Sequence, residues 1–238
     1  MYFEKANRFD KKLVLGKIMG PNPLKLTEEL LVDHAIPDHA VVLDLGSGLG
    51  LTSVFLARDY GFQVFAADLW SDPEENRRFF DSMGLSHEQI TPVKADASAL
   101  PFNNDFFDAV VCVDSYNFFG RDPAFLDDKL LPFVKPGGTL YISVPGMKKD
   151  CHANLPEVLL RSWTPEQLDY IHDINYWQKI FQASRNAELL SIREMQCNEE
   201  AWRDWLASDN EYAINDRKTM LSGGLDFMNF IAIVLRKK

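Results

Sequence analysis

The feature that most constrains the fold is an apolar run that leads directly into a glycine-rich turn. Residues 40–45 read AVVLDL, the pattern of a buried strand, and Gly46, Gly48 and Gly50 follow before a helical segment at 51–60. Glycine tolerates the positive φ angles of a tight turn and places no Cβ between the backbone and a ligand. The free N–H groups at the start of a helix suit a nucleotide at the end of a parallel strand. The segment therefore predicts an α/β fold with a nucleotide-type site.

The rest of the chain alternates strand-like and helical patterns. Further apolar runs with the length of strands lie at 62–67, 89–94, 106–113, 139–144, 188–196 and 227–237. Helix starts, each a capping side chain before proline, lie at Asn22-Pro23, Asp72-Pro73, Asp122-Pro123 and Thr164-Pro165. This alternation is typical of βαβ units. It predicts a Rossmann-like, seven-stranded, mostly parallel sheet with helices on both faces.

We expect one domain over residues 1–238, with two segments covering its site. Residues 1–35 are expected to form an N-terminal helical lid, to which Tyr2, Phe3 and Met19 contribute apolar side chains. Residues 146–187 are expected to form a helical cap insertion. Its aromatic side chains either face the site or form the core of the cap itself: Trp163, Tyr170, Tyr176, Trp177 and Phe181.

Charge and composition disfavour several classes of partner. The formal net charge is −10, and no Lys/Arg cluster exceeds a pair, so nucleic acid is not expected to bind. No apolar run approaches 18 residues, so no membrane span is expected, and the first residues lack a secretion-signal pattern, which predicts a cytoplasmic protein. The three cysteines form no metal-ligand spacing, so we expect no metal site. The oligomeric state, monomer or homodimer, is left open.

The glycine spacing separates two ligand classes. A dinucleotide turn has G-x-G-x-x-G, whereas this chain has G-x-G-x-G, with Asp44 two residues before the first glycine. The segment resembles the first motif of the class I S-adenosylmethionine-dependent methyltransferases. The resemblance implies that the backbone of Gly46, Ser47, Gly48 and Gly50 packs against the methionine part of S-adenosylmethionine. It also implies that Asp44 helps to hold the ammonium group of that cofactor through the loop.

Two further strand ends match the same family. Asp68 ends the second strand, and the resemblance implies that it accepts both ribose hydroxyls while Leu69 and Trp70 cover the adenine. Asp96 follows the third strand, and by the same resemblance it binds the adenine amino group while the Ala97 amide binds a ring nitrogen. The alternatives are a solvated loop acid for Asp68, a core position for Trp70 and an ordinary helix cap for Asp96.

The loop after the fourth strand matches the part of the family that lies under the transferred methyl group. Asp114, Ser115 and Tyr116 occupy the matching positions, and Asp114 is expected to contact the cofactor. Candidate catalytic residues at the acceptor site are Tyr116, His152 and His172, with Tyr176 as a further candidate, although any one of them is more often structural.

The resemblance implies in-line methyl transfer to a small-molecule acceptor. Such a reaction needs mainly alignment of the acceptor with the methyl–sulfur axis and exclusion of water, and some acceptors also need a base. The alternatives are a non-catalytic protein that binds S-adenosylmethionine, a lipid-modifying enzyme of the cyclopropane synthase type and a nicotinamide oxidoreductase. The glycine spacing disfavours the oxidoreductase.

Overall fold

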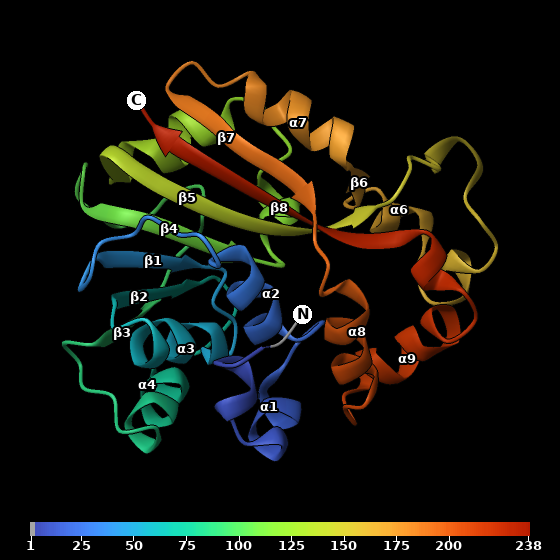
Figure 1. The fold of residues 1–238 in the computed structure, drawn as a ribbon, viewed down its shortest axis with the longest axis horizontal. Coiled ribbons are helices and arrows are strands. Elements are labelled where there is room, and N and C mark those ends of the chain that lie inside the picture. Colours follow the sequence, from blue (N-terminus) through green and yellow to red (C-terminus); the bar gives the residue numbers. More distant parts are fainter. Residues whose placement is uncertain (1–2) are drawn as a thin grey trace.

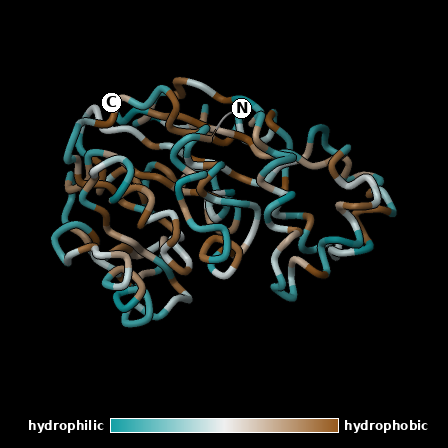
Figure 2. Tube along the Cα trace, turned by 60° about the horizontal axis from the view of Figure 1, so that its bottom comes forward, coloured by the Kyte–Doolittle hydropathy of each residue, from teal (hydrophilic) through white to brown (hydrophobic). Residues whose placement is uncertain are grey.

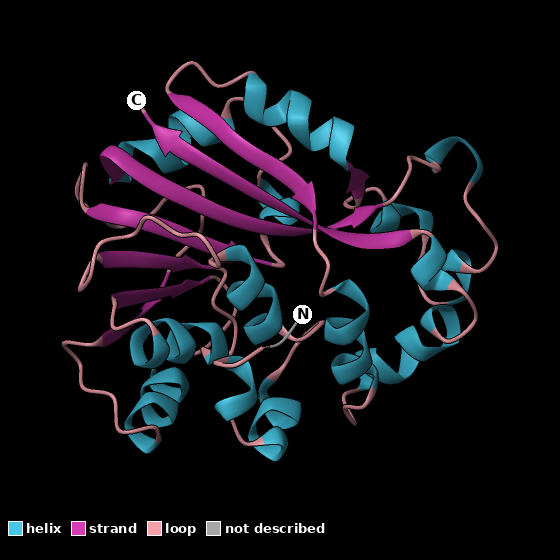
Figure 3. Ribbon diagram, in the orientation of Figure 1, coloured by secondary structure: helices cyan, strands magenta, loops and turns pink. Residues whose placement is uncertain are grey.

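The centre of the fold is one twisted sheet, described for residues 3–238 of a computed structural model (Figures 1 and 3). Its strands are β1 (Val41–Leu45), β2 (Gln63–Asp68), β3 (Ile90–Lys94), β4 (Phe107–Val113), β5 (Val134–Met147), β6 (His172–Asp173), β7 (Ala187–Glu194) and β8 (Met228–Lys237). Their order is β3-β2-β1-β4-β5-β8-β7, and β6 pairs with β5 off this path. β8 pairs antiparallel with both β5 and β7, and the other described strand pairs are parallel. The predicted fold class is confirmed.

The sheet differs from the prediction by the short strand β6. Its His172 and Asp173 pair with Gly146 and Met147 at the end of β5. A strand of two residues is too short to show a periodic pattern, which is why the sequence does not reveal it.

Helices cover both faces of the sheet. They are α1 (Lys11–Lys17), α2 (Pro23–Leu30), α3 (Leu51–Asp59), α4 (Pro73–Ser82), α5 (Tyr116–Phe119), α6 (Pro165–Leu168), α7 (Ile174–Gln182), α8 (Asn198–Leu206) and α9 (Glu211–Met220). One core cluster lies under α2, α3, α4 and α8, and a second lies under α5 and α7. In Figure 2 the hydrophobic segments accordingly alternate with hydrophilic ones along the trace. Every helix within residues 3–238 falls short of the length and apolarity needed to cross a bilayer.

Three of the predicted helix starts are confirmed by their caps. The Asn22 side chain accepts hydrogen bonds from the first amides of α2, and Asp72 does the same for α4. Thr164 and Gln167 form a complete capping box at the start of α6. These caps satisfy amides that have no partner inside the helix.

The helix predicted to start at Asp122-Pro123 is not a regular α-helix in the structure, so this prediction is wrong. Asp122 does accept a hydrogen bond from the Ala124 amide, but a π-helical turn, η2 (Leu126–Leu130), and a 3-10 turn, η3 (Leu131–Phe133), follow. Pro132 explains the change, because it has no N–H to continue an α-helical ladder.

The strand expected over 139–144 is longer in the structure. β5 already begins at Val134, and its register against β4 shifts between Phe107 and Ala109, next to Gly137 at φ +76°. A strand can absorb such a shift as an irregularity instead of ending. β5 is therefore longer than its apolar run indicates.

The topology places a crevice at the carboxyl ends of the central strands. β1 pairs with β2 on one side and with β4 on the other, so the chain leaves the sheet in opposite directions at this point. In open α/β sheets, ligands bind at such a switch point.

Candidate functional site

A cavity of ≈ 600 Å³ lies at this switch point. Its walls come from the glycine turn, from the loops after β2, β3 and β4, and from the segment 17–23. The lining includes Gly46, Ser47, Gly48, Asp68, Leu69, Asp96, Ala97 and Asp114. The structure thus brings together all the residues expected to bind the cofactor except Asp44 and Gly50, which lie behind the lining.

The glycines of the turn expose backbone without side chains, in conformations that would be strained for other residues. Gly46 has φ +78° and Gly48 has φ +51°. A Cβ on Gly46 would lie 2.2 Å from the Ser115 Oγ, and one on Gly48 would lie 2.9 Å from the Met19 Sδ. A Cβ on Gly50 would instead lie 2.4 Å from the Phe80 ring. Gly50 therefore allows α3 and α4 to pack, whereas Gly46 and Gly48 leave room at the cavity.

Asp68 organises the turn as well as facing the cavity. Its Oδ2 accepts a hydrogen bond from the Gly48 amide at 2.9 Å, and its Oδ1 accepts from the Trp70 and Ser71 amides, both at 2.8 Å. A carboxylate offers about four acceptor positions, so three are occupied. These contacts leave one acceptor position, on Oδ2. Asp68 therefore has room to accept one ribose hydroxyl, whereas the sequence led us to expect both. Trp70 is 84% exposed, which excludes a core position for it.

Asp44 acts from behind the cavity. It is fully buried at the end of β1, and the Ser53 Oγ of α3 donates a hydrogen bond to its Oδ2 at 2.5 Å. Burial raises the pKa of Asp44 to about 7; the hydrogen bond from Ser53 opposes this rise, and the negative charge of Asp68 adds to it. Asp44 thus ties the glycine turn to α3, and no contact with a ligand is open to it.

We expect the stability of the fold to fall as the pH rises because of Asp44. Its folded-state pKa of about 7 lies above the value of 3.8 for a free carboxyl, so the folded chain holds this proton more tightly than the unfolded chain. This contribution is complete below pH 3.8 and is lost as the pH rises through 7. The melting temperature of the Asp44→Asn variant should therefore rise relative to that of the parent chain as the pH increases from 5 to 8. Melting curves with a constant difference across that range would contradict the assignment.

Asp96 combines the two roles that the sequence leaves open. Its Oδ1 accepts hydrogen bonds from the Ser98 amide at 2.8 Å and from the Ser98 hydroxyl at 2.7 Å, and these bonds lower the pKa of Asp96. Its Oδ2 has no partner among residues 3–238 and belongs to the cavity wall. The carboxylate is therefore held in place by Ser98 and free on its other oxygen.

Asp114 is the most unusual residue of the cavity. It directly follows β4, in the left-handed region at φ +57°, and its amide donates to the Ser143 carbonyl at 2.8 Å. Its half-buried carboxylate makes no hydrogen bond or ion pair with any of residues 3–238, and it lies 2.4 Å from where Gly20 would carry a Cβ. Burial, and after it the negative charge of Asp216, raise the pKa of Asp114 to about 7. Backbone strain of this kind is concentrated at functional sites.

The structure places Tyr116 away from the cavity, which corrects its expected position at the acceptor. α5 begins at this residue and turns the side chain under the sheet, where it is fully buried. Its ring centroid lies 6.1 Å from that of Trp177 and 5.4 Å from that of Phe181. Trp177 and Phe181 belong to α7, so this part of the expected cap covers the sheet, and its rings are core.

The two predicted histidines form a separate cluster. The rings of His152 and His172 lie 4.9 Å apart, and His172 stacks on Tyr176 at 3.6 Å. The His152 Nδ1 lies 2.7 Å from the Asp150 Oδ1. None of these residues lines the cavity, so a catalytic role for the histidines stays a prediction.

The sequence did not single out most of the segment that closes the cavity. Lys17, Gly20 and Pro21 line it together with Met19, whose side chain is 61% exposed and lies over Gly48. The apolar pattern around Met19 was the only signal for this position. Phe3 is buried in the core, and Tyr2 lies outside the described residues.

A family match covers the same strands. Residues 43–142 match the family described as "Methyltransferase domain", from β1 to β5, and this range contains every residue expected to bind the cofactor. This part of the chain is therefore similar to methyltransferase domains. The relatives named below differ in their acceptors.

Two curated relatives and one solved structure illustrate the likeness. The 2-methyl-6-phytyl-1,4-hydroquinone methyltransferase of Synechocystis sp. is 36% identical over 110 residues, which cover 45% of this chain and 33% of that protein. The glycine/sarcosine/dimethylglycine N-methyltransferase of Actinopolyspora halophila is 30% identical over 105 residues, covering 44% and 18%. The chain thus spans a third or less of the length of both relatives. A putative sarcosine dimethylglycine methyltransferase from Galdieria sulphuraria shares the fold, with a TM-score of 0.65 at 16% identity over 100% and 92% of the two chains.

Proposed function

We propose that this chain is a class I S-adenosylmethionine-dependent methyltransferase, which binds S-adenosylmethionine in the cavity and promotes in-line transfer of a methyl group to a small-molecule acceptor. The observation that carries the proposal is one cavity in which the bare turn at Gly46–Gly48 adjoins Asp68 and the unpartnered Asp114. We further propose that residues 1–238 act as one domain. A cytoplasmic location, expected from the sequence, stays a prediction.

The residues fit the cofactor at three places. The turn leaves backbone where Cβ atoms would fill the space, which suits the amino-acid tail of the cofactor. Asp68 keeps one acceptor position for a ribose hydroxyl, and the Asp96 Oδ2 is free for the adenine amino group. The exposed side chains of Leu69 and Trp70 can cover the adenine.

When bound, the cofactor supplies a methyl group activated by a sulfonium, which the acceptor takes while S-adenosylhomocysteine leaves. The chain itself has to orient the acceptor and exclude water, and orientation is worth about 7–11 kcal/mol in such reactions. Asp114 is placed to accept the proton of the acceptor, because its carboxylate faces the cavity without another partner. Its pKa of about 7 suits a base that works near neutral pH.

We propose that the segment 17–21 closes over the bound cofactor. Met19 already lies over Gly48, and Gly20 lies against the Asp114 carboxylate. This short segment, between α1 and α2, is the part of the expected N-terminal lid that reaches the cavity (Figure 1).

We expect Asp68→Ala to weaken the affinity for S-adenosylmethionine at least about tenfold, since a hydrogen bond to a charged group is worth about 1.5–3 kcal/mol. The substitution also removes the acceptor of the Gly48 amide. Isothermal calorimetry measures the effect. Glu74→Ala is the matched control, because it removes the same charge from a carboxylate that is exposed on α4. Equal affinities of the two variants would remove Asp68 from the site.

A further inference from the structure

A second cavity, of ≈ 360 Å³, lies between α8, α9 and the 3-10 turn η6 (Gly224–Asp226). Figure 1 shows these two helices beside each other, and the cavity shares no lining residue with the one proposed for the cofactor. Its volume falls in the range of cavities that hold small molecules. A ligand of this second cavity would therefore be independent of the proposed function.

The floor of the second cavity is apolar. Trp202 and Leu206 lie one turn apart on α8, Met220 comes from α9, and Leu225 comes from η6. Trp202 and Met220 are buried, whereas Leu221 on the same wall is 74% exposed. An apolar group placed here would remove this surface from water, which is favourable.

A guanidinium held in a fixed position lies in the same wall. The Arg217 Nε donates to the Leu206 carbonyl at 2.8 Å, and its Nη2 donates to the Ser208 carbonyl at 2.6 Å. These bonds hold the half-buried side chain at the end of α8, and Arg217 forms no ion pair within residues 3–238. A guanidinium has five N–H groups, so three remain. They are enough for bidentate binding of a carboxylate.

The other charges of the wall also favour an anion near Arg217. Arg203 is exposed on α8 and forms no ion pair with any residue that the structure describes. Glu199 lies near the start of α8, seven residues before Leu206 and hence about 10 Å along the helix from the end that Arg217 contacts. The formal net charge of the chain is −10, so a wall with two arginines and one acid differs in sign from the chain as a whole. Such a local excess of positive charge attracts anions.

We propose that the second cavity binds an acyl carboxylate, a small acid with an aliphatic chain. Its carboxylate pairs with Arg217 and Arg203, and its chain lies on Trp202 and Met220. An inorganic anion would leave the apolar floor in water, and a neutral chain would leave the guanidinium without a counter-ion. The ligand is bound without any bond being made or broken.

Three probes separate the contributions of the charge and the chain. Octanoate, octan-1-ol and acetate are titrated into the full chain, with calorimetry and tryptophan fluorescence as readouts, because Trp202 lies in the wall. We expect octanoate to saturate one site. It should bind at least about tenfold more tightly than octan-1-ol, which lacks the charge, and than acetate, which lacks the chain. Equal binding of octanoate and either of the other probes, or no saturation by octanoate, would overturn the proposal.

The variant Arg217→Gln removes the charge at the end of α8. We expect it to lower the octanoate affinity at least about tenfold, while octan-1-ol binds as before. Lys218→Gln is the matched control, because Lys218 is exposed on the same helix and lies outside the cavity wall. An unchanged octanoate affinity in Arg217→Gln would refute the role of Arg217.

A second variant covers the case that Arg217→Gln fails to fold. The Arg203 side chain makes no hydrogen bond within residues 3–238, so Arg203→Gln leaves the contacts of α8 in place. It should lower the octanoate affinity at least about threefold. An octanoate affinity equal to that of the parent chain would contradict the pairing.

Two other occupants are outcomes of further measurements. N-acetyl-leucyl-leucine carries a carboxylate on a peptide, and tighter binding of this probe than of octanoate would assign the cavity to a peptide terminus. Self-association of the chain that Leu221→Glu abolishes, measured by analytical ultracentrifugation, would assign it to a second copy. Either result would overturn the acyl carboxylate. We expect octanoate to bind more tightly than the peptide, and the sedimentation of the chain to be independent of Leu221.

Discussion

Gly48→Val is expected to lower the affinity for S-adenosylmethionine at least about 100-fold, which corresponds to about 2.7 kcal/mol. Gly48 sits at φ +51°, a conformation that a β-branched residue strongly resists. Its new side chain would also project toward Met19 into the space proposed for the amino-acid tail of the cofactor. Isothermal calorimetry measures the affinity, and circular dichroism shows whether the fold is kept.

Gly61→Val is the matched control for backbone strain. Gly61 has φ +72°, but a Cβ there would meet no atom within 4 Å. We expect this variant to lose stability as Gly48→Val does, yet to bind the cofactor like the parent chain. If both variants lose binding to the same degree, strain alone explains the effect, and the turn does not touch the ligand.

Asp114→Asn should reduce kcat about 10²–10⁴-fold, the usual contribution of a general base. Asparagine tolerates the left-handed conformation of this position, so the backbone is kept and only the charge is lost. The affinity for S-adenosylhomocysteine, which carries no sulfonium, should stay nearly unchanged. Because the base must be deprotonated, the activity of the parent chain should rise as the pH passes through about 7, the pKa of Asp114. The variant should lose this rise.

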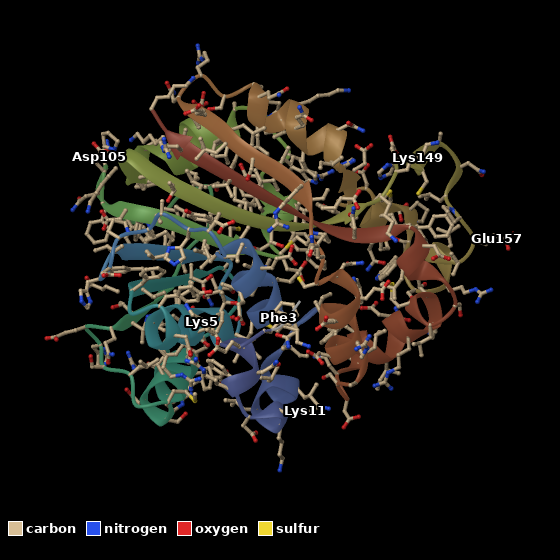
Figure 4. All side chains as sticks on the ribbon, in the orientation of Figure 1. Phe3, Lys5, Lys11, Asp105, Lys149 and Glu157 are labelled. Atoms are coloured by element: carbon tan, nitrogen blue, oxygen red, sulfur yellow. The ribbon has the colours of Figure 1, made fainter. Side chains whose placement is uncertain are left out.

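Asp105→Asn provides the control for this position. Asp105, labelled in Figure 4, also has a left-handed conformation, at φ +52°, but it precedes β4 at the opposite end of the strand. Its carboxylate pairs with Lys237 at 2.8 Å. The activity and pH profile of the Asp105→Asn variant should match those of the parent chain. An Asp114→Asn enzyme with full activity and an unchanged pH profile would show that another group takes the proton.

The sequence predicts the parts of the site that depend on neighbours along the chain. The turn at Gly46–Gly48 follows directly from β1, Asp68 ends the neighbouring strand β2, and Asp96 comes just after β3, the next strand in the sheet. Once the parallel order is known, these residues must meet at one edge of the sheet. This is why the cavity contains almost all of the residues expected to bind the cofactor.

The features that the sequence misses depend on side-chain direction and on distant contacts. Tyr116 directly follows Ser115 of the cavity wall, yet α5 turns its ring into the core against Trp177 and Phe181. Asp68 has three backbone donors that become visible only when the turn has folded around it. Asp216 lies about one hundred residues from Asp114, and no local pattern connects the two.

The most direct test of the cofactor site is a crystal structure of this chain grown with S-adenosylhomocysteine. We predict the amino-acid tail against the backbone of Gly46 and Gly48, with the ribose at the Asp68 Oδ2 and the adenine beside Asp96. Density for the compound elsewhere, or a Met19 side chain that still fills the space over Gly48, would contradict the account.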